Sequence, residues 1–256
     1  MDRSPGHGGL TNPAAWTDQA GYDARFEWGL AGALALAPLV DVLVVVDILR
    51  FTTSVDVAVS RGAEIIPSRF RGPEAEDLAA QFGAQLAGWA APGDTSTFSL
   101  SPVSLQRIQP GTRLVLPSPN GSTITFEAAA ASATVVAGSL RNAAAVGCWC
   151  TGRGPIAVIA AGEQWPGGAL RPAFEDLVGA GAILAALAEA GRGLSPEAAA
   201  AAGAFRAARL PDDLLACSSG VELVAKGFAA DLPLAADLNV SPCVPLLQDG
   251  MFAAAS

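Results

Sequence analysis

The chain is poor in the side chains that most often carry enzyme chemistry near neutral pH. Among its 256 residues are one histidine, His7, one lysine, Lys226, and one tyrosine, Tyr22. His7 lies in a glycine-rich N-terminal stretch, which argues against a histidine general base, a phosphohistidine or a histidine-rich metal site. A P-loop lysine or a Schiff base would have to use Lys226. Chemistry must therefore come from carboxylates, hydroxyls, amides, arginines and backbone N–H groups.

Cysteine is also scarce. The four cysteines, Cys148, Cys150, Cys217 and Cys243, match no common zinc spacing and are few for a secreted disulfide scaffold. We therefore expect reduced cysteines in a cytoplasmic protein. The N-terminal residues contain no apolar signal-peptide core, and the longest apolar run, 29–46, is interrupted by a proline and an aspartate. This run predicts a helix followed by a buried strand, and we expect no membrane partner.

Charged residues make up 15% of the chain, well below the roughly 25% of an average globular protein. So few charges, combined with a hydrophobic fraction of 51%, exclude a disordered chain and a coiled coil. The formal net charge of -9 predicts weak binding to phosphate backbones, so we expect no nucleic-acid partner. The length suits one or two domains with a sizeable core.

Short apolar runs alternate with helical stretches along most of the chain. This alternation is typical of an α/β fold with a mainly parallel sheet flanked by helices. After residue 195 the strands stop, which predicts a helical C-terminal extension over about 195–230 and then an irregular tail. We expect residues 1–20 to form a flexible segment and 21–256 a single domain. Strands are predicted at 22–28, 42–46, 64–67, 84–87, 113–116, 134–137 and 156–160, and helices at 29–37, 52–60, 74–82, 121–131, 139–146 and 174–190.

Polar side chains follow several predicted strands at the points where they end. Because ligands of open α/β sheets bind outside the carboxyl ends of the strands, we expect these side chains to share one rim. The candidate catalytic residues are Asp47, Arg50, Asn120, Ser122, Ser139 and Asn142. The candidates for substrate binding are Thr52, Thr53, Gly121, Gly138, Gly162, Glu163 and Arg171, and those for metal binding are Asp47, Glu175 and Asp176.

These residue types suit the binding of an anion beside a divalent cation. Three of the segments are predicted to enter helices, whose N-termini bind anions through free N–H groups and the helix dipole. Arg50 and Arg171 could add bidentate contacts to phosphate or sulfonate oxygens. Asp47, Glu175 and Asp176 offer the oxygen ligands that suit Mg²⁺ bound partly through water.

Each feature also has a structural explanation that the sequence leaves open. Asp47 and Ser139 could simply cap the helices that follow them, and the Asn-Gly pair at 120–121 is a common turn. The acids at 175–176 would lie in a first helical turn, where the dipole favours them. Only their coincidence at one rim favours a functional site.

Four segments resemble a known family. The run VLVVVDILRFTTSVDVAVSRGA at 42–63 is followed by Ser-Pro-Asn-Gly-Ser at 118–122, Gly-Ser-Leu-Arg-Asn at 138–142, and Gly-Glu at 162–163 before FEDLVGAG at 174–181. In order and spacing they resemble the motifs of the 2-phosphosulfolactate phosphatase family, over about residues 42–226. The resemblance implies an Mg²⁺-dependent enzyme that hydrolyses 2-phospho-3-sulfolactate to sulfolactate and phosphate, on the route to coenzyme M. It also implies a site lined by Asp47, Arg50, Asn120, Gly121, Ser122, Ser139, Asn142, Glu175 and Asp176.

Three motifs depart from the family pattern. Where the family usually reads Thr-Thr-Asn-Gly-Thr, this chain has Pro119, which removes a backbone donor. The family's Gly-Glu-Arg is replaced by Gly-Trp-Ala at 88–90, and its Asn-Ser-Pro by Leu-Ser-Pro at 100–102. These changes could alter the substrate, weaken metal binding or abolish catalysis.

The sequence therefore favours an Mg²⁺-dependent phosphomonoesterase of a small phosphorylated or sulfonated acid, with Asp47 as general base for a water nucleophile. Two alternatives stay open. One is a non-catalytic anion-binding protein, favoured by the altered middle loop, and the other is a different hydrolase or lyase of small anionic acids. Trp16, Phe26 and Trp28 could form an exposed patch in a homo-oligomer or could belong to the core.

Overall fold

The computed structural model describes residues 16–89, 91, 94, 96–131 and 133–255, which fold around a nine-stranded sheet. The strand order is β1-β7-β2-β6-β10-β11-β3-β5-β4. Every pairing is parallel except those made by β10 and β11. The strands are Ala24–Trp28 (β1), Val42–Val46 (β2), Glu64–Ser68 (β3), Gln85–Leu86 (β4), Arg113–Pro117 (β5), Thr134–Gly138 (β6), Ile156–Ala160 (β7), Pro245–Gln248 (β10) and Met251–Ala254 (β11), with Glu163–Gln164 (β8) and Leu170–Arg171 (β9) paired separately.

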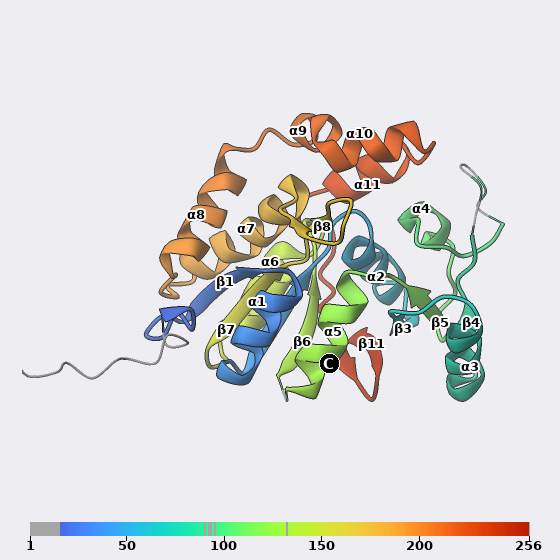
Figure 1. Ribbon diagram of the computed structural model, residues 1–256, viewed down its shortest axis with the longest axis horizontal. Coiled ribbons are helices and arrows are strands. Elements are labelled where there is room, and N and C mark those ends of the chain that lie inside the picture. Colours follow the sequence, from blue (N-terminus) through green and yellow to red (C-terminus); the bar gives the residue numbers. More distant parts are fainter. Residues whose placement is uncertain (1–15, 90, 92–93, 95, 132, 256) are drawn as a thin grey trace, which may run out of the picture.

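Helices cover both faces of the sheet (Figure 1), which confirms the α/β fold with a mainly parallel sheet. One core lies under α6, α7 and α8, and a second under α1, α2, α4 and α5. The helices are Gly29–Leu36 (α1), Phe51–Val59 (α2), Pro73–Phe82 (α3), Pro102–Leu105 (α4), Gly121–Ala130 (α5), Ala143–Cys150 (α6), Phe174–Glu189 (α7), Pro196–Ala207 (α8), Asp212–Ala216 (α9), Ser218–Ala225 (α10) and Asp231–Ala236 (α11), with a 3-10 turn at Ala37–Leu39.

The central strand β2 explains the continuous apolar run seen in the sequence. Side chains alternate between the two faces of a strand, and here both faces are covered. Val44 and Val46 join one core, whereas Leu43 and Val45 join the other, and all of these residues are fully buried. The carboxyl end of β2 is therefore held firmly at the middle of the sheet, directly before Asp47.

The C-terminal tail was expected to be irregular, and this expectation is wrong. Strands β10 and β11 form an antiparallel hairpin that joins β6 to β3. Its two-residue turn, Asp249 and Gly250, has positive φ at both positions, which is the conformation that Asp-Gly pairs favour in hairpins. Phe252 of this hairpin is fully buried and contacts Phe51 at 6.3 Å between ring centroids. The tail is thus part of the sheet and of the second core.

The predicted helical extension is present and continues beyond 230 through α11. In Figure 1, α9, α10 and α11 lie above the upper end of the sheet, on the side where the loops after the parallel strands are found. Arg50 from the loop after β2 pairs with Asp231 of α11, and Arg171 of β9 donates to Ser219 of α10. The extension therefore covers the rim that carries the candidate residues.

Three local expectations need correction. The helix predicted over 139–146 begins instead at α6, after a turn at 139–142, and the β8–β9 ribbon forms within 162–172, where no strand was predicted. Of the segment 1–20, residues 1–15 lie outside the described residues, whereas the side chain of Gln19 is bonded to the backbone of Phe26 in β1. Residues 16–20 are thus anchored to the domain.

The aromatic residues near the N-terminus do not form one exposed patch. Phe26 is buried, and its ring meets that of Trp28 edge to face at 5.5 Å, with Trp28 packed partly against the core. Trp16 is 73% exposed. No helix in the described part of the chain is long and apolar enough to cross a membrane.

Candidate active site

The loop between β2 and α2 carries Asp47 and is fixed by its own hydroxyl groups. The Thr52 hydroxyl accepts from the Asp47 backbone N–H at 3.0 Å and lies 2.9 Å from the Asp47 carbonyl oxygen, to which it donates. The Thr53 hydroxyl donates to the Ile48 carbonyl at 2.8 Å. Both threonines were expected to bind substrate. In the structure their hydroxyls shape the loop that presents Asp47.

The Asp47 carboxylate links the starts of two helices. Its Oδ1 accepts from the backbone N–H of Phe51 at 3.3 Å, and its Oδ2 accepts from that of Gly121 at 3.0 Å. The Ser118 hydroxyl lies 3.5 Å from the same Oδ2. A Cβ at position 121 would lie 2.3 Å from the Phe51 ring, so only glycine permits this approach. The Asp47 side chain therefore caps the starts of α2 and α5, and the Gly121 N–H donates to its carboxylate.

Asp176, in the first turn of α7, holds two strand-end loops together. Its Oδ1 accepts from the Ile48 N–H at 2.7 Å, and its Oδ2 accepts from the Gly162 N–H at 2.8 Å. The loops after β2 and β7 are thereby tied to the start of the long helix. Asp176 therefore positions these two loops, and, like Asp47, it accepts backbone hydrogen bonds at both of its oxygens.

Four carboxylates, those of Asp47, Glu163, Glu175 and Asp176, influence one another's charge at this rim and are called the acid cluster below. Burial, then the charge of Glu175, raises the pKa of Asp47 to about 6. Burial, then the charges of Asp47 and Glu175, raises the pKa of Glu163 to about 7, and the same causes raise that of Asp176. Within the described residues, no lysine or arginine lies within salt-bridge distance of any of the four. Arg171 lowers the pKa of Glu163 without forming an ion pair, and the cluster still carries an excess of negative charge.

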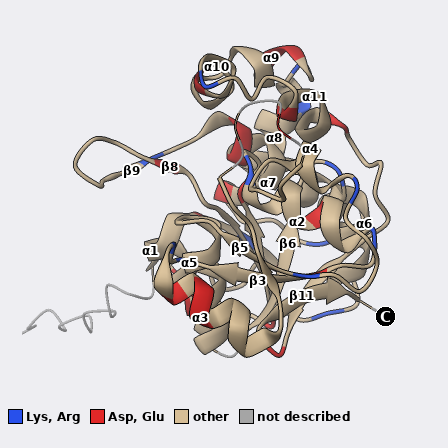
Figure 2. Ribbon diagram, turned by 90° about the vertical axis from the view of Figure 1, so that its right-hand side faces the viewer, with Lys and Arg blue, Asp and Glu red and all other residues tan. Residues whose placement is uncertain are grey.

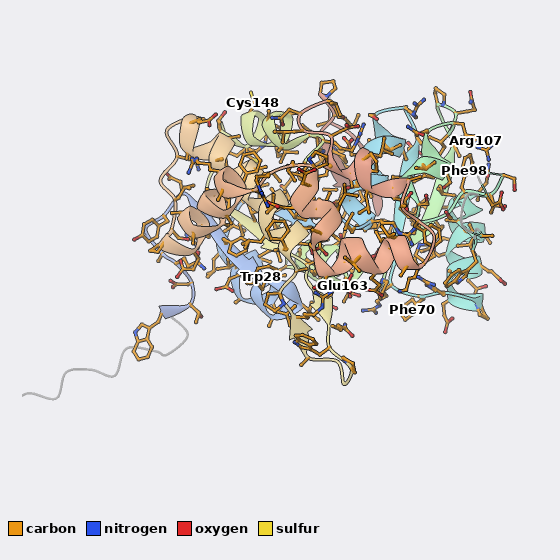
Figure 3. All side chains as sticks on the ribbon, turned by 90° about the horizontal axis from the view of Figure 1, so that it is seen from above. Trp28, Phe70, Phe98, Arg107, Cys148 and Glu163 are labelled. Atoms are coloured by element: carbon orange, nitrogen blue, oxygen red, sulfur yellow. The ribbon has the colours of Figure 1, made fainter. Side chains whose placement is uncertain are left out.

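Polar groups from other segments surround the acid cluster. The Asn120 amide donates to Glu163 Oε2 and to the Gly162 carbonyl, each at 3.3 Å. The Cys217 thiol lies 3.5 Å from Glu175 Oε2. Figure 3 looks down on this side of the molecule and shows Glu163 close to Trp28, with which it lines a hollow beside the β8–β9 ribbon. Asn120 and Glu163 are thus brought together as expected.

Arg50 is the cation of the rim, and the C-terminal extension positions it. Its guanidinium donates to Asp231 Oδ2 at 2.9 Å and lies 4.3 Å from the centroid of the Phe228 ring. The Ser101 hydroxyl donates to the other oxygen of Asp231. Figure 2 shows acidic and basic segments near one another between the sheet and the C-terminal helices. Asp231, at the start of α11, and Phe228, in the loop before it, belong to no motif of the sequence, and Ser101 was noted only within the Leu-Ser-Pro departure.

The segment after β6 makes a self-contained turn. The Asn142 side-chain oxygen accepts from the backbone N–H of Ser139 at 2.8 Å and from its hydroxyl at 3.1 Å, while its amide donates to the Ala137 carbonyl. A Cβ at Gly138 would lie 2.5 Å from Ile183 in the core, so this glycine serves packing and not the approach of an anion. Among the described residues, no side-chain hydrogen bond joins Ser139 or Asn142 to the acid cluster. By contrast, the buried Ser122 hydroxyl has no hydrogen-bond partner among the described residues.

Comparisons with known proteins identify the family of this chain. Residues 33–250 match the family model described as 2-phosphosulpholactate phosphatase. The chain belongs to this family. A relative from Carboxydothermus hydrogenoformans, named "Probable 2-phosphosulfolactate phosphatase", is 34% identical over 222 residues, which cover 81% of this chain and 87% of the relative. Family membership confirms the expectation of a phosphoric monoester hydrolase.

Two of the three departures from the family pattern lie in one hollow. Trp89 and Leu100 line a pocket that also includes Arg50, Arg71 and Phe228. Pro119 lies apart from it, in the hollow that contains Glu163. The departures therefore change the surroundings of Arg50 more than those of Asp47.

We predict that Asp231→Asn lowers kcat/KM for phosphate esters by about 10- to 100-fold, because the Arg50 guanidinium loses the charge that positions it. Asp237→Asn removes an exposed partner of Arg141 in the same part of the chain and is the matched control. Steady-state kinetics of the two variants, with circular dichroism to confirm folding, make the comparison. A folded Asp231→Asn variant with the activity of the control would contradict this role.

We also predict that the acid cluster makes the protein less stable as the pH rises. An acid whose pKa is raised on folding binds more protons in the folded state than in the unfolded state. For Glu163, the stability that this difference contributes is fully present below the unfolded pKa of about 4 and is lost as the pH rises through the folded pKa of about 7. Melting temperatures between pH 4.5 and pH 8 should therefore decline less in Glu163→Gln than in the wild type. Equal pH dependence in both proteins would be inconsistent with a raised pKa at Glu163.

Proposed function

We propose that the protein is an Mg²⁺-dependent phosphatase that hydrolyses the phosphate ester of a small 2-hydroxy acid, 2-phosphosulfolactate or a relative of it. The observation that carries this proposal is the acid cluster at the strand ends, together with Arg50, which lies on the same loop as Asp47. An excess of buried carboxylates calls for a cation, and an adjacent arginine suits a phosphoryl group. Family membership supports the same reaction.

The negative charge of the acid cluster suits Mg²⁺, but its carboxylates do not form a complete set of metal ligands. Among the described residues, no group of three acidic, cysteine or histidine side chains is arranged to hold one metal ion. The expectation that Asp47, Glu175 and Asp176 act together as ligands therefore becomes a narrower proposal. Mg²⁺ usually keeps several waters and uses one or two carboxylates with substrate phosphate oxygens. Asp47 and Glu175 would supply those carboxylates, with Glu163 beside them and Asp176 as the positioning residue.

Mg²⁺ held by Asp47 and Glu175 would neutralise the phosphoryl oxygens and would lower the pKa of a bound water. Arg50 uses the N–H groups not bonded to Asp231 to bind the phosphoryl oxygens as negative charge develops on them. Asp47 accepts the proton of the attacking water. The new bond joins water oxygen to phosphorus, the bond from phosphorus to the ester oxygen breaks, and that oxygen takes up a proton to form the hydroxy acid.

The remaining functional expectations are proposals of the same kind. Four free cysteines, at Cys148, Cys150, Cys217 and Cys243, suit a reducing compartment, and we propose a cytoplasmic enzyme on that basis. A place on the route to coenzyme M follows only if the substrate is 2-phosphosulfolactate. The homo-oligomer, the small phosphorylated or sulfonated acid as partner, and the lack of a nucleic-acid partner also stay predictions.

Phosphate release from a panel of small 2-phospho acids, with Mg²⁺ and with EDTA, tests the proposed function. We predict release that requires Mg²⁺ and falls by at least about 100-fold in Asp47→Asn, because the general base is lost. Asp77→Asn changes an exposed acid on α3 and should retain wild-type rates.

Folded protein that releases no phosphate from any ester would contradict the phosphatase proposal. If that protein still binds the product acids, the non-catalytic anion-binding alternative gains support. Release that is unchanged in EDTA, after exhaustive dialysis against it, would contradict the metal dependence alone.

A further inference from the structure

The pocket beside Arg50 has an unusual lining for a site that receives a multiply charged substrate. Its walls include the Trp89 indole, Leu100, Pro117 and Phe228, together with Arg50 and Arg71. Trp89 is 83% exposed, and its ring lies 5.6 Å from the Arg71 guanidinium. An exposed indole at the mouth of a pocket provides a flat apolar surface on which an incoming group can be buried. We call this hollow the Trp89 pocket.

Few polar groups in the Trp89 pocket are free to receive a second anionic group. Arg50 is paired with Asp231, and the Ser99 hydroxyl is within bonding distance of Ser104. Arg71 forms no ion pair with any described residue. The Arg71 guanidinium can bind the carboxylate of the substrate. If the substrate also carried a sulfonate, the sulfonate oxygens would lie against apolar side chains without hydrogen-bond donors. Such unpaired polar groups are costly to bury.

We propose that the Trp89 pocket binds an apolar substituent of the substrate, so that the preferred ester is a 2-phospho acid with an aromatic or branched alkyl group in place of a sulfonate. This inference rests on the proposed function and specifies its substrate class. The phosphate lies toward Arg50, whose loop also carries Asp47, the carboxylate toward Arg71, and the apolar group against Trp89 and Leu100. Trp89 and Leu100 are then specificity-determining residues.

The test compares phosphate esters of three 2-hydroxy acids that differ only at C3: 3-phenyllactate, lactate and 3-sulfolactate. We predict that wild-type kcat/KM for the phenyl ester exceeds that for the sulfonate ester by about tenfold or more. Trp89→Ala and Leu100→Asn should each lower kcat/KM for the phenyl ester by about tenfold, and change that for the lactate ester far less. Trp16→Ala, an exposed indole outside the pocket, is the matched control and should change none of these ratios.

Calorimetric measurement of how tightly the free hydroxy acids bind distinguishes a failure of this inference from a failure of the proposed function. Tighter binding of phenyllactate than of sulfolactate, lost in Trp89→Ala, would support the pocket even if no ester were hydrolysed. Hydrolysis with a preference for the sulfonate ester, and with ratios unchanged in Trp89→Ala, would overturn the pocket and leave the phosphatase proposal intact.

Discussion

The burial of Asp47 among other carboxylates is the constraint on which the rest of the site depends. A buried charge without a paired cation is costly, and among the described residues backbone N–H groups at two helix N-termini and one hydroxyl offset it. The protein fixes these donors by holding β2 between two covered faces and by tying its carboxyl end to α7 through Asp176. The result is a preorganised anionic site that favours either a proton or a bound cation, beside an arginine that favours an anion.

The sequence predicted the parts of this arrangement that depend on local pattern. The apolar run of β2 indicated a strand buried on both faces, and the acid that follows it lies at the rim, as expected for a parallel sheet. The predicted start of α7 is also that of the structure, and it places Glu175 and Asp176 at the same rim. Glu163 was expected as a substrate-binding residue. Its place within the acid cluster depends on the fold of the β8–β9 ribbon, which the sequence did not indicate.

The features that the sequence did not indicate depend on contacts between residues far apart in the chain. The C-terminal hairpin contains a favourable Asp-Gly turn, yet nothing local indicates that it lies between β6 and β3. Asp231 and Arg50 are 181 residues apart, and their ion pair forms only because the extension folds back over the rim. Ser139 and Asn142 resemble site residues by motif, but their hydrogen bonds close a turn. A motif identifies which residues are present at a strand end, whereas the partners of each side chain follow from the tertiary fold.

We propose that the acid cluster holds a divalent cation, and calorimetric titration of Mg²⁺ into the metal-free protein measures this binding. We predict one binding site per chain at pH 7.5, with weaker binding at pH 5 because Asp47 and Glu163 become protonated below pKa values of about 6 and 7. Asp47→Asn should weaken binding at pH 7.5 by about tenfold or more, whereas Asp77→Asn should not. Wild-type affinity in Asp47→Asn, or no binding to the folded wild-type protein, would contradict the account.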